Sequence, residues 1–406
     1  MSKTETPSIR FRGFDDAWEQ RKLGDCFSER VENMPDGELI SVTINDGIKK
    51  FSELGRHDNS NDDKSKYKKV CVGDIAYNSM RMWQGASGYS PYEGIVSPAY
   101  TVLSPNAGVL SKCIAYQFKL PQMIHTFQIN SQGITSDNWN LKYPALSEIE
   151  IYISQSAAEQ KQIAEFFTSI DRLITLHQRK FEKLTNVKKS MLEKMFPQNG
   201  SCYPEIRFKG FTDPWEQRKL GDIVERVVRK NTNNESSLPL TISAQYGLVD
   251  QITYFNNRVA SRDVSNYYLV LNGEFAYNKS TSDGFPFGAV KRLDLYEKGV
   301  LSTLYIVFSI KNQSEIDSDY LTVFFDTDRW HKGVSERAAE GARNHGLLNI
   351  SADDFFDIDI FLPRHKEEQV AIGSYLRHLD HLITLHQREL EKLQSIKKAL
   401  LEKMFV

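Results

Sequence analysis

The sequence has little of what marks secreted, membrane-bound or metal-binding proteins. Only four cysteines occur among 406 residues, at positions 26, 71, 113 and 202, and none stands at zinc-site spacing from another cysteine or a histidine. No apolar run approaches the ~18 residues of a membrane span. The polar segment 1–12 lacks the apolar core of a signal peptide. These absences predict a reduced, metal-free and cytoplasmic protein.

A marked excess of one charge is absent as well. The formal net charge is −2, whereas a protein that coats nucleic acid without regard to sequence carries a strong positive excess. This net charge is still compatible with a protein that binds a specific nucleic-acid sequence through basic residues gathered on one face. The length is enough for two or three domains of ordinary size.

The chain is built from two copies of one plan. Residues 9–25 and 206–222 are identical at 14 of 17 positions, at an offset of 197 residues. Residues 159–196 and 368–405 match at 21 of 38 positions, at an offset of 209. Between these blocks the halves are only faintly alike. Fixed ends with divergent middles favour a duplicated recogniser, because a duplicated enzyme is expected to keep catalytic residues in at least one middle.

Both copies of the second block have a seam that repeats every seven residues, which predicts two long coiled-coil helices. A 38-residue helix is ~57 Å long, and one DNA turn is ~34–36 Å, so a helical strut of this length could hold two reading heads about one turn apart. Simple dimerisation is the alternative, and the two seam histidines are expected to be packed rather than metal-bound. The seam residues are Ile163, Ile170, His177, Leu184 and Met191 in the first helix and Ile372, Leu379, His386, Leu393 and Leu400 in the second.

The two middles, about 26–155 and 223–364, alternate short β-prone runs with turn clusters. Each is expected to be a compact α/β domain with an antiparallel or mixed sheet, which makes the whole chain α+β. Strands are expected at 39–44, 74–77, 100–103, 148–153, 275–277, 305–310 and 356–362, and short helices near 111–130 and 319–333.

Side chains that can form paired hydrogen bonds with base edges gather in the loops expected after the strands. The same residue types are ordinary in loops, so each individual assignment rests on the pattern as a whole. The candidate DNA contacts are Arg81, Trp83, Gln84, Asn138 and Asn140 in the first half, and Lys279, Ser280, Arg343, Asn344 and His345 in the second.

No pattern typical of an active site stands out. The stretch from Gly273 to Ser280 resembles a phosphate-binding loop but has Asn278 where the second glycine belongs. The Pro-Pro-aromatic loop of a methyltransferase that receives a flipped base is absent, since no Pro-Pro pair occurs. The carboxylates Asp213 and Glu216 recur as Asp16 and Glu19, which makes them part of the repeated framework rather than a nuclease metal site. The chain is therefore expected to be non-catalytic.

The repeated motifs resemble those of type I restriction–modification specificity subunits, over essentially the whole chain. Ile9-Arg10-Phe11-x-Gly13-Phe14, then Trp18-Glu19 and Leu23-Gly24-Asp25, is similar to the start of such subunits and recurs at 206–222. Glu159-Gln160 and Glu368-Gln369 resemble the entry to the family's two conserved helices. The segment from Gly341 to Leu347 is similar to a loop that often precedes that entry.

The resemblance implies target-recognition domains at 1–155 and 198–364, joined by conserved spacer helices at 156–197 and 365–406 that pack antiparallel. Each domain would read one half of a split double-stranded DNA site. Two methyltransferase subunits would bind around the helices and use S-adenosylmethionine to methylate adenine, and ATP-driven restriction subunits would join them. S-adenosylmethionine, ATP and magnesium would belong to those partners, with no cofactor in this chain and no membrane partner.

Two other interpretations stay open on the sequence alone. The chain could be a coiled-coil scaffold that binds no DNA and whose middles bind peptides. It could also be a nuclease or methyltransferase with an unfamiliar active site.

Overall fold

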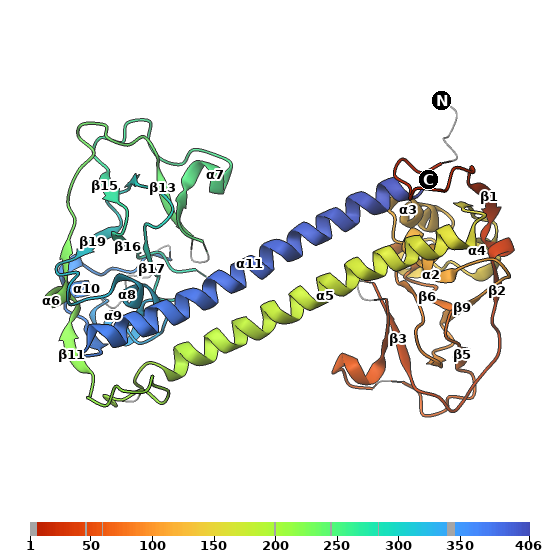
Figure 1. The fold of residues 1–406 in the computed structure, drawn as a ribbon, viewed down its shortest axis with the longest axis horizontal. Helices are drawn as coiled ribbons and strands as arrows, with labels where there is room; N and C mark the ends of the chain where they lie inside the picture. The colour runs from red at the N-terminus through yellow and green to blue at the C-terminus, as the bar shows by residue number, and fades with distance from the viewer. Residues whose placement is uncertain are drawn as a thin grey trace. The chain divides into compact units, whose positions relative to one another are not determined.

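The protein folds as two compact units, each of which has its own core. A computed structural model describes residues 6–44, 47–58, 60–198, 200–243, 246–282, 284–338 and 346–406. Unit 1 comprises Met1–Gln178 and Arg388–Val406, and unit 2 comprises Arg179–Gln387. Each unit therefore combines one divergent middle with parts of both long helices (Figure 1). The division by contacts falls within the two long helices, between Gln178 and Arg179 and between Gln387 and Arg388.

Unit 1 is built around a four-stranded antiparallel sheet in the order β2-β9-β6-β7. Three antiparallel pairs flank it, namely β1 with β10, β3 with β4, and β5 with β8. Its elements are β1 (Glu19–Lys22), α1 (Leu23–Cys26), β2 (Phe27–Glu29), β3 (Ile40–Thr43), β4 (Gly47–Lys50), η1 (Phe51–Leu54), β5 (Lys68–Val70), β6 (Ile75–Asn78), η2 (Met82–Gln84), β7 (Ser87–Tyr89), β8 (Gly94–Val96), β9 (Tyr100–Pro105), α2 (Ser111–Gln117), α3 (Pro121–Ile129), η3 (Ser136–Asn138), α4 (Tyr143–Ser147) and β10 (Glu150–Ile153).

Unit 2 repeats this architecture with a sheet in the order β12-β19-β16-β17 and the pairs β11 with β20, β13 with β14, and β15 with β18. The same strand order in both units confirms the internal duplication expected from the sequence. Its elements are β11 (Glu216–Lys219), α6 (Leu220–Ile223), β12 (Val224–Arg226), β13 (Leu240–Ser243), β14 (Gly247–Asp250), α7 (Gln251–Phe255), β15 (Tyr268–Leu271), β16 (Phe275–Asn278), β17 (Ala289–Arg292), β18 (Lys298–Leu301), β19 (Ile306–Ile310), α8 (Ser318–Phe324), α9 (His331–Arg337), α10 (Ala352–Phe356) and β20 (Asp359–Leu362).

The central strands β6 and β16 form for the same reason in both units. Gly73 and Gly273 adopt positive φ angles of 99° and 85°, which a glycine tolerates without strain, and each turns the chain into the strand. The next three residues of each strand are fully buried, as expected for a strand covered on both faces. The stretch that begins at Gly273 and resembles a phosphate-binding loop is thus a turn entering a central strand.

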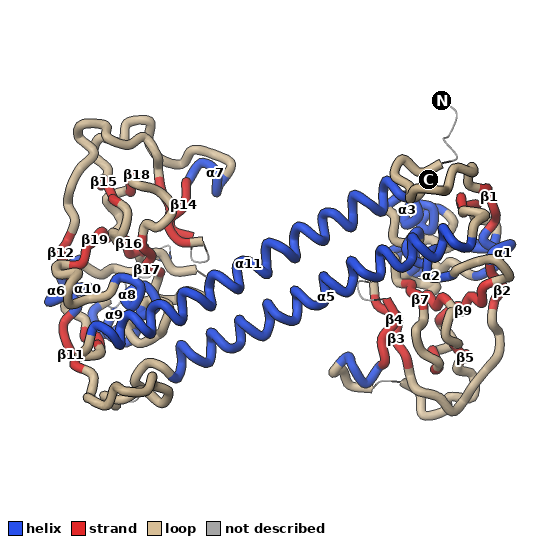
Figure 2. The backbone as a smooth tube through the Cα atoms, in the orientation of Figure 1, coloured by secondary structure: helices blue, strands red, loops and turns tan. Residues whose placement is uncertain are grey.

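The two long helices are α5 (Ala157–Lys194) and α11 (Lys366–Met404). Within unit 1, Asp171 of α5 pairs with Lys397 of α11, with 2.6 Å between carboxylate and ammonium. Within unit 2, Lys188 of α5 pairs with Asp380 of α11 at the same distance. In each unit the start of one helix therefore lies beside the end of the other, which is an antiparallel arrangement (Figure 2). The predicted long antiparallel helices and the α+β class are confirmed.

Most of the expected strands occur within a residue or two of their predicted places, and one expectation needs correction. The short helices expected near 111–130 are α2 and α3, which are separate because Pro121 starts α3, and those expected near 319–333 are α8 and α9. The strand expected at 356–362 begins only at Asp359, because Ser351 caps a short helix α10 that ends at Phe356. None of the described helices combines the length and apolar character that a membrane crossing needs.

Candidate nucleic-acid interface

A tight turn directly after β6 carries the first group of candidate contacts. The amide of Arg81 donates to the carbonyl of Asn78 at 2.9 Å, and the amide of Gly85 donates to that of Met82 at 2.8 Å. The side chain of Met82 is fully buried in the core of unit 1 and anchors the turn to that core. Gly85 has a φ of 83°, so a glycine is required for the chain to return into β7. This turn, residues 78–86, leaves Arg81 exposed to solvent.

The second candidate loop of unit 1, residues 131–141, lies against this turn. The amide of Leu141 donates to the carbonyl of Ser79 at 2.9 Å. The rings of Trp83 and Trp139 meet edge to face with their centroids 5.2 Å apart. The structure therefore brings together two loops that are about 60 residues apart in the chain.

The five candidates of the first half differ in how freely they can reach a partner. Arg81 and Asn138 are exposed, while Trp83, Gln84 and Asn140 are half-buried. The indole N–H of Trp83 is already donated to the carbonyl of Met80 at 3.1 Å. The side-chain oxygens of Gln84 and Asn140 are buried without a hydrogen-bond partner in the described structure. Arg81 and Asn138 are thus the side chains best placed to contact a base edge or phosphate.

Unit 2 builds the same junction with different side chains. The amide of Leu348 donates to the carbonyl of Lys279 at 3.0 Å, and this bond is equivalent to the one between Leu141 and Ser79. Thr281 and Gly346 add two further hydrogen bonds between the same segments. Asn78 and Asn278 also play the same part, since each side chain accepts a bond from the amide two residues on. The frame of the junction is shared, whereas the residues it displays are not.

The candidates of the second half are only partly covered by the structure. Ser280 is exposed. Lys279 is half-buried, and its ammonium donates to the carbonyl of Ile350 at 3.3 Å, so it supports the junction. Arg343, Asn344 and His345 lie outside the described residues.

A buried ion pair joins each repeated opening motif to the start of a long helix. In unit 1 the Glu159 carboxylate, fully buried, accepts two bonds from Arg10 at 2.6 and 2.9 Å and one from the indole of Trp18 at 3.2 Å. In unit 2, Glu368 accepts the equivalent bonds from Arg207 and Trp215. The bond to Glu159 raises the pKa of Arg10 above its ordinary value. These joints explain why the two ends of each half keep their sequence: they fix each α/β domain on its helix.

The seam residues of the long helices contribute to the cores of both units. Ile163 and Ile170 are buried in unit 1, and Ile372 and Leu379 in unit 2. Leu184 and Met191 are half-buried against the core of unit 2, and Leu400 against that of unit 1. His177, His386 and Leu393 are half-buried. The seven-residue pattern thus marks the face of each helix that turns away from solvent.

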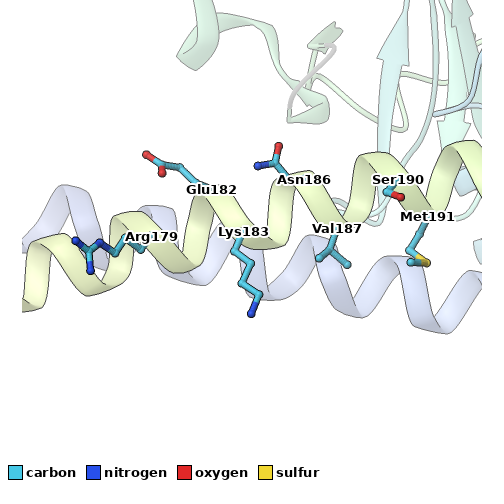
Figure 3. A pocket seen from close by; sticks show the side chains of 7 residues that line it. All are labelled: Arg179, Glu182, Lys183, Asn186, Val187, Ser190 and Met191. Carbon is cyan, nitrogen blue, oxygen red and sulfur yellow. The ribbon is translucent and has the colours of Figure 1, made fainter. Parts of the chain in front are cut away.

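An open depression follows one face of α5 in unit 2 (Figure 3). All of its lining residues come from this single helix, so nothing encloses a small ligand there. It is lined by Arg179, Glu182, Lys183, Asn186, Val187, Ser190 and Met191. Among the residues that the structure describes, no group of three or more histidine, cysteine, aspartate or glutamate side chains could hold a metal ion.

Lys119 is a candidate that sequence reasoning missed. It lies two residues after α2, and its ammonium contacts the turn 78–86. No motif marks a lysine whose partners are backbone carbonyls, because any sequence can supply such acceptors. Only the fold brings it to the candidate interface.

Comparisons with known proteins agree with the resemblance seen in the motifs. Residues 15–186 match the family model of the type I restriction modification DNA specificity domain. The chain is 24% identical over 361 residues to the type I restriction enzyme MjaVIII specificity subunit of Methanocaldococcus jannaschii, covering 83% of this chain and 81% of that protein.

A solved structure has the same fold. The crystal structure of the type I restriction–modification system S subunit from M. genitalium superposes with a TM-score of 0.62 at 14% identity and covers 99% of both chains. Residues 15–186 thus match a type I restriction modification DNA specificity domain, and the similarity to a type I specificity subunit extends over most of the chain.

Proposed function

We propose that each unit reads one half of a bipartite DNA site, and that the long helices set the distance between the halves. The observation that carries this proposal is the shared junction behind different loops. The bond from Leu141 to Ser79 in unit 1 and that from Leu348 to Lys279 in unit 2 hold the same frame. A protein that binds two different half-sites needs two such frames with different side chains on them.

The chemistry of the exposed side chains suits base readout. An arginine such as Arg81 can donate two parallel hydrogen bonds to the O6 and N7 of guanine, and an asparagine such as Asn138 can pair with the N6 and N7 of adenine. Arg81 stands on the turn 78–86 and Asn138 in the loop 131–141 that packs against it, so little backbone entropy is lost when they bind. Arg81 and Asn138 are the readout residues that we propose for the first half-site.

The helices are proposed to do two things besides fixing the spacing. Their outer faces expose apolar side chains that partner proteins could cover, among them Leu173, Leu176, Leu385 and Ile396 with exposed fractions of 39–46%. We infer that methyltransferase subunits bind there and that restriction subunits join them. A specificity subunit is the non-catalytic part of its complex, so S-adenosylmethionine, ATP and magnesium are assigned to those partners.

The test is to map adenine methylation across the host genome by single-molecule sequencing, with and without this gene. We expect methylation to disappear at one split motif when the gene is removed. Restoring the gene as Arg81→Ala should weaken or relax one half of that motif, by about 1–3 kcal/mol for a lost paired contact to guanine, and leave the other half unchanged.

Arg12→Ala is the matched control, because Arg12 is an exposed arginine that belongs to neither loop of unit 1. It should leave the motif as it is. If both halves of the motif change with Arg81→Ala, the assignment of one half to each unit is wrong. If purified chain with its partners shows no salt-sensitive binding to DNA, a scaffold role replaces the proposed readout.

A further inference from the structure

Lys119 ties three separate segments of unit 1 together. Its ammonium donates to the carbonyl of Gly85 at 2.6 Å, of Ser87 at 2.8 Å and of Ile44 at 3.2 Å. Gly85 belongs to the turn 78–86, Ser87 starts β7, and Ile44 follows β3. A lysine ammonium has three N–H donors, so all three are used on backbone acceptors.

Among the described residues, no carboxylate forms an ion pair with Lys119. In the part of the chain that the structure describes, the charge that acts on it is the positive one of Lys397 on α11. Lys397 is paired with Asp171 of α5 at 2.6 Å and lies over the ring of Tyr116 of α2, whose hydroxyl donates to the same aspartate. Burial, and to a lesser degree the charge of Lys397, lower the pKa of Lys119 to about 8.

The equivalent position of unit 2 holds a residue of opposite charge. Lys119 and Asp326 each lie two residues after a seven-residue helix, at an offset of 207 that also relates Ser111 to Ser318. Asp326 accepts from Lys291 of β17 at 2.8 Å and from Lys188 of α5 at 3.1 Å. Burial raises its pKa, but these two lysines outweigh burial and leave the pKa below its ordinary value. Asp326 therefore stays charged near neutral pH.

We propose that Lys119 is a positioning residue for DNA readout by unit 1, and that it holds the turn 78–86 in its reading conformation through its three backbone bonds. The proposal rests on the function proposed for that turn. Unit 2 fixes the equivalent strand through Asp326 and Lys291, an ion pair instead of an ammonium on carbonyls. The two units therefore fix these equivalent segments by different interactions, although their folds are the same.

Loss of one proton from Lys119 weakens its hold on the turn. A neutral amine has two N–H donors for three carbonyls, so one of the acceptors loses its bond. Because the folded protein loses this proton at a lower pH than an unfolded lysine, with its pKa of about 10.4, deprotonation does not destabilise the fold as the pH rises above 8. A loss of readout between pH 7.5 and 9 would then report the turn and not unfolding.

The first experiment measures the affinity of the full chain, assembled with its partners, for duplexes that carry either half-site intact. Between pH 7.5 and 9 the affinity for the half-site read by unit 1 should fall roughly five- to tenfold, which is the fall in the protonated fraction of Lys119 for a pKa of about 8. The other half-site should show no such fall. Lys119→Arg keeps its charge at both pH values and should remove the pH dependence, whereas Lys119→Met should bind the first half-site weakly at both.

A second readout needs no DNA, so it separates failure of this proposal from failure of the proposed function. Trypsin cleavage after Arg81 in the full chain reports how well the turn is held, with cleavage after the exposed Arg262 of unit 2 as the internal reference. Lys119→Met should speed cleavage after Arg81 several-fold, and Lys119→Arg should restore it. Lys66→Met removes an exposed lysine of unit 1 and should have no effect.

The outcomes are distinct. Unchanged cleavage after Arg81 in Lys119→Met, or a pH dependence that persists in Lys119→Arg, overturns the positioning role. Faster cleavage that Lys119→Arg restores, in a protein that binds no DNA, keeps the role of Lys119 in holding the turn and overturns the readout function instead.

Discussion

At the scale of single residues, Glu159 and Glu368 are the most deeply buried charged side chains among the described residues. Each carboxylate is fully buried, is paired with one arginine and accepts a hydrogen bond from one tryptophan N–H. A buried ion pair contributes little net stability compared with apolar side chains of the same shape, but removing one partner leaves the other charge uncompensated. These joints are therefore the places where a single change of charge should cost most.

We expect Glu159→Gln to lower the free energy of unfolding of unit 1 by about 3 kcal/mol. The guanidinium of Arg10, whose side chain is only 14% exposed, would keep its charge without a counter-charge. Urea unfolding of the full chain measures the effect, as does Glu368→Gln for unit 2. Glu165→Gln is the control, because the side chain of Glu165 is 66% exposed in its ion pair with Lys161; it should change stability by less than about 0.5 kcal/mol. If Glu159→Gln and Glu165→Gln lower the free energy of unfolding by similar amounts, the uncompensated charge of Arg10 does not destabilise unit 1.

Sequence reasoning at this scale found the loops but not the bonds that join them. Arg81 and Trp83 were singled out because they follow a predicted strand, and both do stand on the turn after β6. That residues 131–141 pack against this turn rests on a backbone bond from Leu141 to Ser79, which leaves no trace in side-chain composition. For the same reason the sequence could not reveal that the ammonium of Lys279 donates a hydrogen bond to the carbonyl of Ile350.

At the scale of elements, the long helices were the easiest to predict. Their apolar side chains repeat over five heptads, and Pro197 closes the first, so its predicted range of 159–196 differs from α5 by two residues at each end. Short elements were harder because local signals conflict. Phe356 to Leu362 reads as β-prone, but the cap at Ser351 turns its first residue into the end of α10.

The spacing role that we propose for the helices predicts the result of a matched insertion. Seven residues are added between Gln178 and Arg179 and seven between Gln387 and Arg388, which are equivalent positions at the 209-residue offset. One heptad keeps the seam in register and adds ~10.5 Å of helix. We expect a longer gap in the methylated motif, by about three base pairs at ~34 Å per ten, with both half-site sequences unchanged.

The control is the same seven-residue insertion in α5 alone. It lengthens α5 between Asp171 and Lys188 but leaves α11 between Asp380 and Lys397 unchanged, so the pairs Lys188–Asp380 and Asp171–Lys397 can no longer form together. With this variant, methylation of the split motif should be lost, and no motif with a longer gap should be methylated. An unchanged gap in the matched double insertion would show that the helices do not set the spacing.

At the scale of the whole chain, both opening motifs contact the end of a long helix in the same way, although only one of them directly follows that helix in the sequence. In unit 2 the amide of Ile206 donates to the carbonyl of Lys194 at 3.0 Å, a contact between the end of α5 and the opening motif that follows it. In unit 1 the amide of Ile9 donates to the carbonyl of Lys403 at 2.9 Å, so the first opening motif meets the end of α11 in the same way. By the offsets of 209 and 197, Val406 and Met1 are equivalent to Pro197 and Gln198.

This equivalence predicts that a circularly permuted chain keeps its fold and both specificities. Joining Val406 to Met1 places 11 residues between Lys403 and Ile9 (404–406 and 1–8), as many as lie between Lys194 and Ile206 (195–205). The permuted chain begins at Gln198 and ends at Pro197. We expect it to methylate the same split motif with its partners, since each unit keeps every contact described for it. A chain opened instead within α5, between Gln178 and Arg179, is the matched control and should fail, because it interrupts a continuous helix. Loss of one half-site in the first permuted chain would mean that covalent order, and not the repeated contact, fixes the opening motif on its helix.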